Sequence, residues 1–249
     1  LVGTDGNGDY GVGIGAFWGT ESLETITVDS KSRSYVVYDG VLYKLKNNTT
    51  TKEVLIKCPD TRTNCVYIPP TVTEIADYAF CGCENLVGPI NLPSNLIKIG
   101  ERAFCNCKSL DGAINLPDTT TSLGSCAFYT CESLEELNIG NGIKDIPTDC
   151  FAYCTSLKKL TIPNSVTDIR ERAFFYCTGV ESLTLGNNVA SIESWAFDYF
   201  KSLKGDLINP SGAITGGSVA QKTVNILGRG REIEDLQKQI KKLEKQKED

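Results

Sequence analysis

The chain has 249 residues, 41% of them hydrophobic and 22% charged, which fits one elongated globular domain or two small ones. Its net charge of −6 argues against a nucleic-acid-binding surface, which needs a basic footprint. No run approaches the ~18 consecutive apolar residues of a membrane helix, so we expect no membrane span.

The chain contains no histidine and no methionine but has 11 cysteines. The lack of histidine excludes a Ser-His-Asp triad and a His-ligated zinc site. A chain without methionine that begins at Leu1 indicates a processed protein, and we expect that a signal peptide has been removed.

The N-terminal part, residues 1–28, is predicted to form a cap and a first repeat. Val12, Phe17 and Leu23 have the spacing of the apolar residues in the repeats that follow. Residues 29–70 interrupt this spacing and predict a β-hairpin insert within the fold. Asp39-Gly40, the favoured two-residue hairpin turn, separates two apolar runs there.

Residues 71–227 carry a repeat with a period of 23 or 24 residues, and we expect them to form repeats and a closing strand. One phenylalanine marks each copy: Phe80, Phe104, Phe128, Phe151, Phe174 and Phe197. Apolar residues recur eight and five residues before it and six after it, followed by an alternating pair such as Leu137 and Ile139. Because so short a unit cannot bury its own apolar face, stacked copies must form a solenoid with one strand per copy in a parallel sheet.

The segment from Ser156 to Cys177, with its Leu-x-x-Leu-x-Ile-Pro run and Ala-Phe-x-x-Cys ending, resembles the BspA-like leucine-rich repeats. Six copies across roughly residues 66–207 share this pattern, and Val12–Val28 matches as a seventh. The resemblance implies a curved leucine-rich-repeat β-solenoid with its parallel sheet on the concave face. It also implies an exported or cell-surface protein, since several relatives act as adhesins.

Five cysteines lie three residues after the repeat phenylalanine and are predicted to form a ladder of buried, reduced thiols: Cys83, Cys107, Cys131, Cys154 and Cys177. Equivalent positions on adjacent strands lie ~4.8 Å apart with parallel side chains, which does not suit a disulfide. Phe200 replaces the cysteine in the last copy, as expected for an apolar site.

The other cysteines include one candidate disulfide, Cys58–Cys65, which flanks a short loop. Cys81 and Cys105 occupy one position in adjacent copies, and Cys126 and Cys150 occupy nearby positions. Either pair could bridge neighbouring turns. A thiolate metal site is disfavoured because two of its four ligands would come from the buried ladder, so no metal is expected.

The outward side chains of the predicted strands form a candidate binding face on the concave sheet. Its residues are Asn91, Asn115, Glu136, Asn138, Lys159, Thr161, Ser182 and Thr184. Such a face suits macromolecular recognition by a solenoid, but asparagine and threonine are also ordinary on a wet sheet.

A second surface feature is aromatic: Tyr153, Tyr176 and Tyr199 occupy one position in three successive copies, beside Tyr129, Phe175 and Trp195. Exposed aromatic residues suit contact with proteins or glycans. The alternative is that these rings pack on the turns between repeats.

The last segment, residues 228–249, is predicted to be a charged helix. Ile233, Leu236, Ile240 and Leu243 follow a 3-4-3 spacing. This seam favours self-association as a coiled coil, although the helix could instead pack on the last repeat.

The resemblance implies a non-enzymatic binding or adhesion module, and the residues themselves show no catalytic constellation and no expected cofactor. The expected partners are host or neighbouring-cell proteins, or glycans, and not nucleic acid. One alternative is a rigid spacer that the C-terminal helix multimerises. A remote alternative is a carboxylate-based glycan hydrolase, for which no pair of acids in contrasting environments can be recognised.

Overall fold

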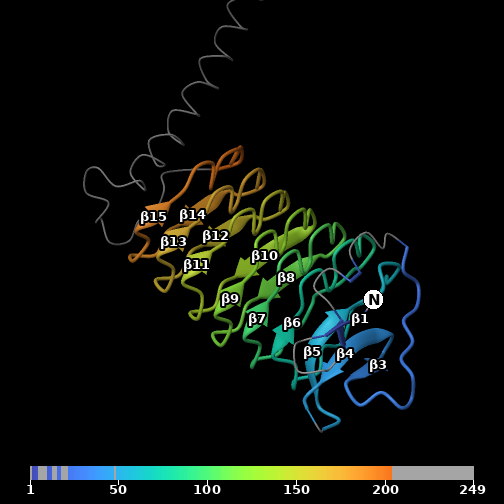
Figure 1. The fold of residues 1–249 in the computed structure, drawn as a ribbon. Coiled ribbons are helices and arrows are strands. Elements are labelled where there is room, and N and C mark those ends of the chain that lie inside the picture. Colours follow the sequence, from blue (N-terminus) through green and yellow to red (C-terminus); the bar gives the residue numbers. More distant parts are fainter. Residues whose placement is uncertain (1, 5–9, 13–15, 18–21, 48, 204–249) are drawn as a thin grey trace, which may run out of the picture.

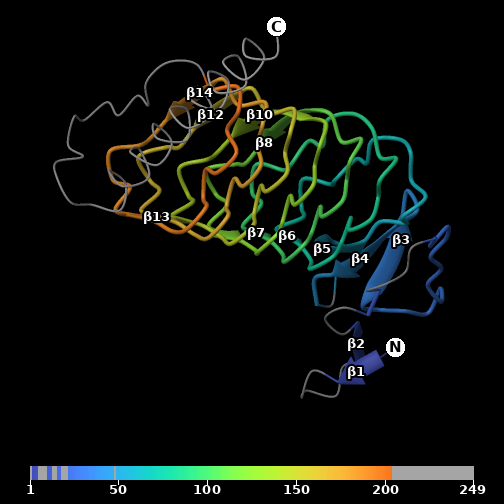
Figure 2. The same cartoon turned by 90° about the horizontal axis from the view of Figure 1, so that it is seen from above.

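The computed structural model describes residues 2–4, 10–12, 16–17, 22–47 and 49–203, which form an elongated solenoid (Figure 1). Six buried phenylalanines of the repeat mark six successive turns. Strands lie on two opposite sides of the solenoid, as Figure 2 shows. The closing strand and the C-terminal helix with Ile233, Leu236, Ile240 and Leu243, predicted from the sequence, lie outside the described residues.

The first ladder of strands is the one that the alternating apolar pairs predict. It consists of β8 (Gly112–Asn115), β10 (Leu134–Asn138), β12 (Lys159–Thr161) and β14 (Ser182–Thr184), all parallel. Buried aliphatic residues of these strands face the interior, as Leu160 does between its exposed neighbours Lys159 and Thr161. The register shifts between Leu134 and Glu136, opposite Gly112 with its positive φ of 78°.

Each turn also contributes a second, shorter strand, so the expectation of one strand per repeat was wrong. These strands are β6 (Glu74–Ile75), β7 (Lys98–Ile99), β9 (Ser122–Leu123), β11 (Asp145–Ile146), β13 (Asp168–Ile169) and β15 (Ser191–Ile192). They pair in parallel through the aliphatic residue five positions before the repeat phenylalanine. A strand of two residues has no alternation for a sequence pattern to reveal.

This second ladder is divided between β9 and β11. One turn earlier, the residue after the strand, Gly124, donates its backbone N–H to the carbonyl of Ile99 at 2.8 Å. The residue at this position after β11 is Pro147, which has no N–H to donate to Leu123. The proline therefore removes one of the hydrogen bonds that join neighbouring turns of this ladder.

The third side of each turn is a tight segment centred on the repeat phenylalanine. The residues two before and two after it have positive φ, between 51° and 82°: Tyr78, Arg102, Cys126, Asp149, Arg172 and Trp195 before it, and Gly82, Asn106, Thr130, Tyr153, Tyr176 and Tyr199 after it. Their amides donate along the solenoid axis to the next turn, as Tyr153 N does to Phe175 O at 2.7 Å. Hydrogen bonds between turns thus satisfy the backbone where no strand exists.

The interior is a continuous stack. The six repeat phenylalanines lie with ring centroids 4.7–5.6 Å apart and ring planes within 5–9° of parallel. Beside them run the buried free thiols of Cys83, Cys107, Cys131, Cys154 and Cys177. The last four each donate to the carbonyl of a repeat phenylalanine, as in the 3.1 Å contact from Cys107 Sγ to Phe80 O. Phe200 takes this position in the last turn and packs edge-on against Phe197.

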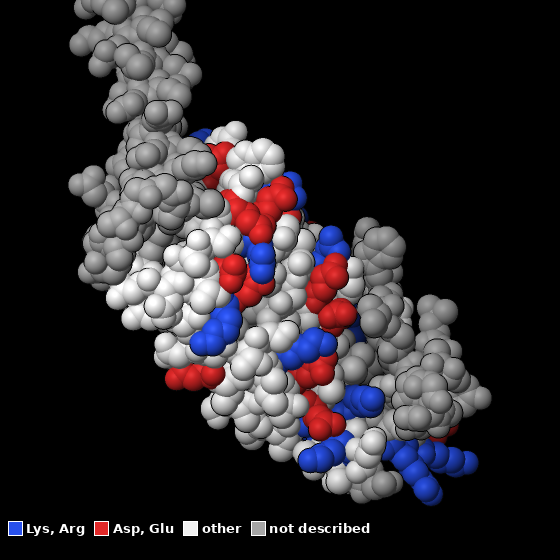
Figure 3. Space-filling view, turned by 60° about the vertical axis from the view of Figure 1, so that its left-hand side comes forward, with Lys and Arg blue, Asp and Glu red and all other residues white. Residues whose placement is uncertain are grey.

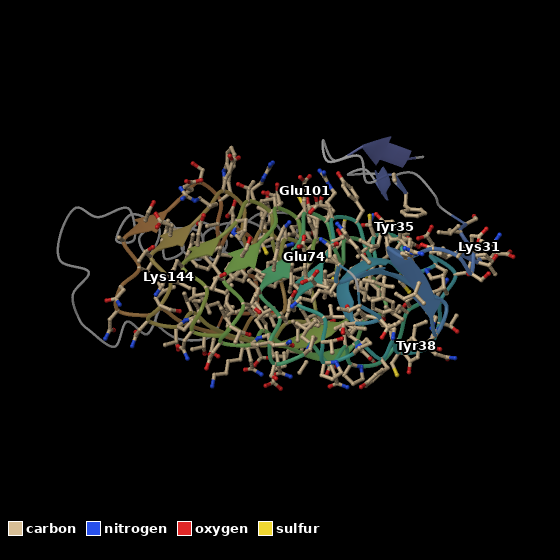
Figure 4. All side chains as sticks on the ribbon, turned by 60° about the horizontal axis from the view of Figure 1, so that its bottom comes forward. Lys31, Tyr35, Tyr38, Glu74, Glu101 and Lys144 are labelled. Carbon is tan, nitrogen blue, oxygen red and sulfur yellow. The ribbon has the colours of Figure 1, made fainter. Side chains whose placement is uncertain are left out.

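The hairpin predicted at residues 29–70 is present, and the third strand that Glu53–Lys57 predicts follows it. β3 (Tyr35–Tyr38), β4 (Val41–Leu45) and β5 (Lys52–Lys57) form an antiparallel meander. β5 then pairs in parallel with β6, so the three strands of the insert extend the second ladder at its N-terminal end. Tyr35 and Tyr38 lie at this end of the solenoid, far from Lys144 (Figure 4).

The predicted first repeat does not join either ladder in the described residues. β1 (Val2–Thr4) pairs antiparallel with β2 (Tyr10–Val12) in a separate two-stranded sheet, and residues 22–28 form no strand. The physical reason is that β5 occupies the edge of β6 on which an earlier repeat would have stacked.

Candidate functional site

The face of the first ladder carries most of the residues predicted to bind. Asn115, Glu136, Asn138, Lys159, Thr161, Ser182 and Thr184 all lie on its strands, whereas Asn91 is exposed outside a strand. Asn138 Nδ2 donates to Asn115 Oδ1 and to Glu136 Oε1, each at 2.8 Å. These side chains partly satisfy one another, so this polar face contributes to the structure as well as offering a contact surface.

A second surface lies on the third side of the C-terminal turns, and we call it the aromatic hollow. It has a volume of about 470 Å³, and its aromatic walls are Tyr129, Tyr153, Phe175, Trp195 and Tyr199. Its polar residues are Asp149, Arg172 and Asp198. The side chains come from positions one and two residues after, and two residues before, the repeat phenylalanine in successive turns, which the backbone ladder holds in line.

The rings of the hollow form a chain of edge-to-face contacts. Tyr129 meets Tyr153 at 5.4 Å, Tyr153 meets Phe175 at 5.6 Å, and Phe175 meets Tyr199 at 5.3 Å, with ring planes 66–79° apart. The interpretation that these rings pack between turns is therefore confirmed, whereas contact with proteins or glycans stays a prediction. The rings pack between turns, yet Trp195 and Tyr199 remain 57% and 47% exposed.

Charges inside the hollow are partly paired. Arg172 Nη2 lies 3.1 Å from Asp149 Oδ2, while Arg172 Nε is buried and has no hydrogen-bond acceptor among the described residues. Burial raises the pKa of the Asp149 carboxyl above its ordinary value, and the nearby Arg172 opposes that rise. Asp198 Oδ1 accepts the backbone N–H of Tyr199 at 3.1 Å. The site thus holds both donors and acceptors.

Elsewhere on the solenoid, charged side chains pair with opposite charges in the neighbouring turn. Lys98 lies 2.8 Å from Glu74, and Arg170 bridges Asp145 and Glu193 at 2.9 and 3.0 Å. Figure 3 shows these two signs interspersed along one face. Such exposed pairs each contribute about 0–1 kcal/mol and create no strong field of one sign.

The candidate disulfide Cys58–Cys65 is not formed in the structure. Cys58 is buried against the thiol of Cys83, whereas Cys65 is exposed beside the turn at Gly88, so the two side chains lie in different environments. Cys126 and Cys150 are also free thiols. The short loop between Cys58 and Cys65 suggested that the two thiols lie close together. The sequence did not reveal that Cys58 faces the interior whereas Cys65 faces the solvent.

Cys81 and Cys105 are free thiols that hydrogen-bond to each other across adjacent turns. This hydrogen bond, with help from the Lys57 ammonium, lowers the pKa of Cys81 to about 7. Lys57 itself is buried and paired with Asp60.

Among the described residues, no group of three acidic, cysteine or histidine side chains is placed to hold a metal ion. Within the same part of the chain there is no helix long and apolar enough to cross a bilayer.

The prediction from the sequence missed Asp149, Arg172 and Asp198. They lie two residues before or one residue after the repeat phenylalanine. Many residue types occur at these two positions, so no sequence pattern marks them. A signal for the unusual backbone did exist, because Gly82 and Asn106 are the residue types that favour positive φ.

Solved structures of bacterial leucine-rich-repeat proteins share this fold. A leucine-rich cell surface protein from Faecalibacterium prausnitzii is 27% identical, with a TM-score of 0.57 over 85% of this chain and 46% of that one. A Treponema pallidum leucine-rich-repeat protein is 26% identical, with a TM-score of 0.59 over 75% of this chain and 84% of the other. An Eubacterium ventriosum leucine-rich-repeat protein is 28% identical, with a TM-score of 0.61 over 78% and 56%. The chain thus spans about half the length of the first of these proteins.

A short stretch also resembles the chromosome partition protein Smc of Bacillus subtilis, with 46% identity over 43 residues. That match covers 17% of this chain and only 4% of Smc, so it says nothing about the solenoid.

The model of the BspA type leucine rich repeat region matches residues 10–87, 59–111 and 73–204 in 6 copies. These matches cover most of the chain and coincide with the stacked turns, the phenylalanine interior and the thiol ladder. The chain therefore belongs to the BspA-type leucine-rich repeat family.

Proposed function

We propose that the chain is the binding module of an exported cell-surface protein, that it is not an enzyme, and that it adheres to macromolecules of a host or neighbouring cell. Membership of the BspA-type family supports this proposal, as does the similarity to a cell surface protein of F. prausnitzii. A solenoid offers long continuous faces to such partners.

The observation that carries the proposal is the exposure of aromatic side chains on strained backbone. Trp195 and Tyr199 are exposed and have positive φ of 57° and 64°, a conformation that costs about 1–2 kcal/mol for a residue with a Cβ. Strain of this kind is found at functional sites because the surrounding fold offsets it. Large exposed aromatic residues also recur at contact surfaces between macromolecules.

The test is a binding screen of the full chain against immobilised matrix proteins and a glycan array. A variant with Asn115, Asn138 and Thr161 changed to Lys probes the face of the first ladder. A variant with the exposed residues Thr121, Ser122 and Ala190 changed to Lys adds the same charge elsewhere and serves as the control.

Saturable binding to either panel supports the proposal. If only the first variant loses binding, the partner sits on the first ladder. If neither variant loses binding, the site lies on another surface, such as the aromatic hollow. No binding by the folded wild-type chain on both panels contradicts the proposal.

A further inference from the structure

The tyrosines of the aromatic hollow occupy backbone positions with positive φ, which glycine and asparagine adopt more readily. Gly82, Asn106 and Thr130 hold the same position in the first three turns, with φ of 82°, 60° and 60°. The fold therefore does not require a large side chain there. Tyr153 and Tyr199 accept the cost of positive φ and place their rings in the walls of the hollow.

The ring contacts make this surface preformed. Each ring of the chain from Tyr129 to Tyr199 is held edge-on by the next one, so little ordering is needed when a ligand binds. Trp195 lies at the same wall and is the most exposed of these rings at 57%. A volume of about 470 Å³ lies in the range of pockets that bind small-molecule ligands.

The polar groups narrow the chemistry of the ligand. A cation would lie beside the Arg172 guanidinium, and an anion would lie beside the carboxylates of Asp149 and Asp198. A neutral ligand with several hydroxyl groups is not repelled by either charge. A hydroxyl group can donate a hydrogen bond to a carboxylate or accept one from a guanidinium. The C–H faces of such a ligand pack on aromatic rings.

We propose that the aromatic hollow binds the neutral sugar residues of a glycan, with pyranose rings packed against Trp195 and Tyr199 and hydroxyls bonded to Asp149, Arg172 and Asp198. This inference rests on the proposed binding function and assigns it a site and a ligand class. The glycan is recognised as part of a glycoprotein or polysaccharide on the partner surface.

Tryptophan fluorescence provides a direct readout. The chain has two tryptophans, so Trp18→Phe leaves Trp195 as the single reporter. Neutral hexose and N-acetylhexosamine oligosaccharides are titrated into this full-length variant. We expect a saturable change in Trp195 emission with at least one of them, and matched binding by calorimetry.

Two substitutions test the walls. Tyr153→Asn and Tyr199→Asn remove the rings but place a residue that tolerates positive φ, as Asn106 does at the same position of an earlier turn. Each should weaken sugar binding about tenfold or more, the usual effect of losing an aromatic anchor. Tyr78→Asn is the matched control, because Tyr78 also has positive φ (60°) but lies outside the hollow.

The outcomes separate the two proposals. If the chain adheres to a protein partner in the screen but no neutral sugar changes Trp195 emission, the inference is overturned and the binding function stands. If a basic or acidic peptide is the ligand that the two tyrosine variants lose, the sugar assignment is wrong. If the folded chain binds nothing on any panel, both proposals fail.

Discussion

The first and last turns of the solenoid share one interior but differ at the surface beside it. From Phe80 to Phe197 the rings stack with parallel planes, and the backbone keeps two positive-φ residues per turn. The two residues after the phenylalanine are Cys81-Gly82 in the first turn and Phe175-Tyr176 in the fifth. The interior therefore specifies the turn, while these two positions are free to carry either thiols and small residues or aromatic rings.

The largest expected effect tests the shared interior. Phe104→Ala and Phe174→Ala each remove a fully buried ring from the stack and should each lower the free energy of unfolding by about 3–5 kcal/mol. Urea denaturation followed by circular dichroism measures both. Ile97→Ala, at a residue 51% exposed, is the control and should change stability by no more than about 0.5 kcal/mol. A large loss of unfolding free energy in only one of the two variants would show that the early and late turns do not depend equally on the phenylalanine stack.

The next effect concerns how closely the turns approach. A Cβ on Gly124 would overlap the backbone nitrogen of Glu101, whereas the same position in a later turn is Arg170. Gly124→Ala should cost about 1–3 kcal/mol because backbone must move. Arg170→Ala loses only exposed ion pairs and should cost at most about 1 kcal/mol. Equal melting temperatures for Gly124→Ala and the wild type would show that the close backbone approach at this position does not require glycine.

A smaller effect measures the strain that the tyrosines carry. Gly82 has a φ of 82°, and no heavy atom lies within 4 Å of the position that a Cβ would occupy, so Gly82→Ala changes conformational preference without a clash. We expect a loss of about 1–2 kcal/mol in chemical denaturation. Gly82→Asn should lose less, because asparagine tolerates this conformation. An alanine variant as stable as the wild type would remove the argument that Tyr153 is strained.

The smallest effect leaves stability unchanged and concerns the thiols of the first turns. With the pKa of Cys81 at about 7, its thiolate fraction rises as the pH passes through 7. Alkylation by iodoacetamide, followed residue by residue by mass spectrometry, should therefore accelerate near pH 7 at Cys81. Cys177, whose pKa burial raises well above its ordinary value, should stay unmodified. A Cys81 profile centred on the ordinary thiol pKa of about 8.5 would contradict the pairing with Cys105.

The sequence was sufficient to predict the turns but not the site. Alternation around Leu137 and Leu160 predicts the first ladder, and the six phenylalanines predict the stack, because both depend on burial that recurs with every period. The second ladder has one buried residue per strand, such as Ile146, and leaves no such pattern. Asp149 and Arg172 come together only through the stacking of consecutive turns, which places residues 23 positions apart side by side.

The missing N–H at Pro147 has a mechanical consequence for a solenoid under tension, as the proposed adhesion would place it. Tension along the solenoid axis is carried by the hydrogen bonds that join one turn to the next, and these bonds are loaded in parallel. Among the described residues, the junction between β9 and β11 lacks the backbone hydrogen bonds that join the other turns of the second ladder, so it is the seam at which a stretched solenoid should part first. The aromatic residues Tyr153, Phe175, Trp195 and Tyr199 all lie on one side of that seam. A pulled chain would therefore yield there and separate Tyr129 from the other rings of the aromatic hollow.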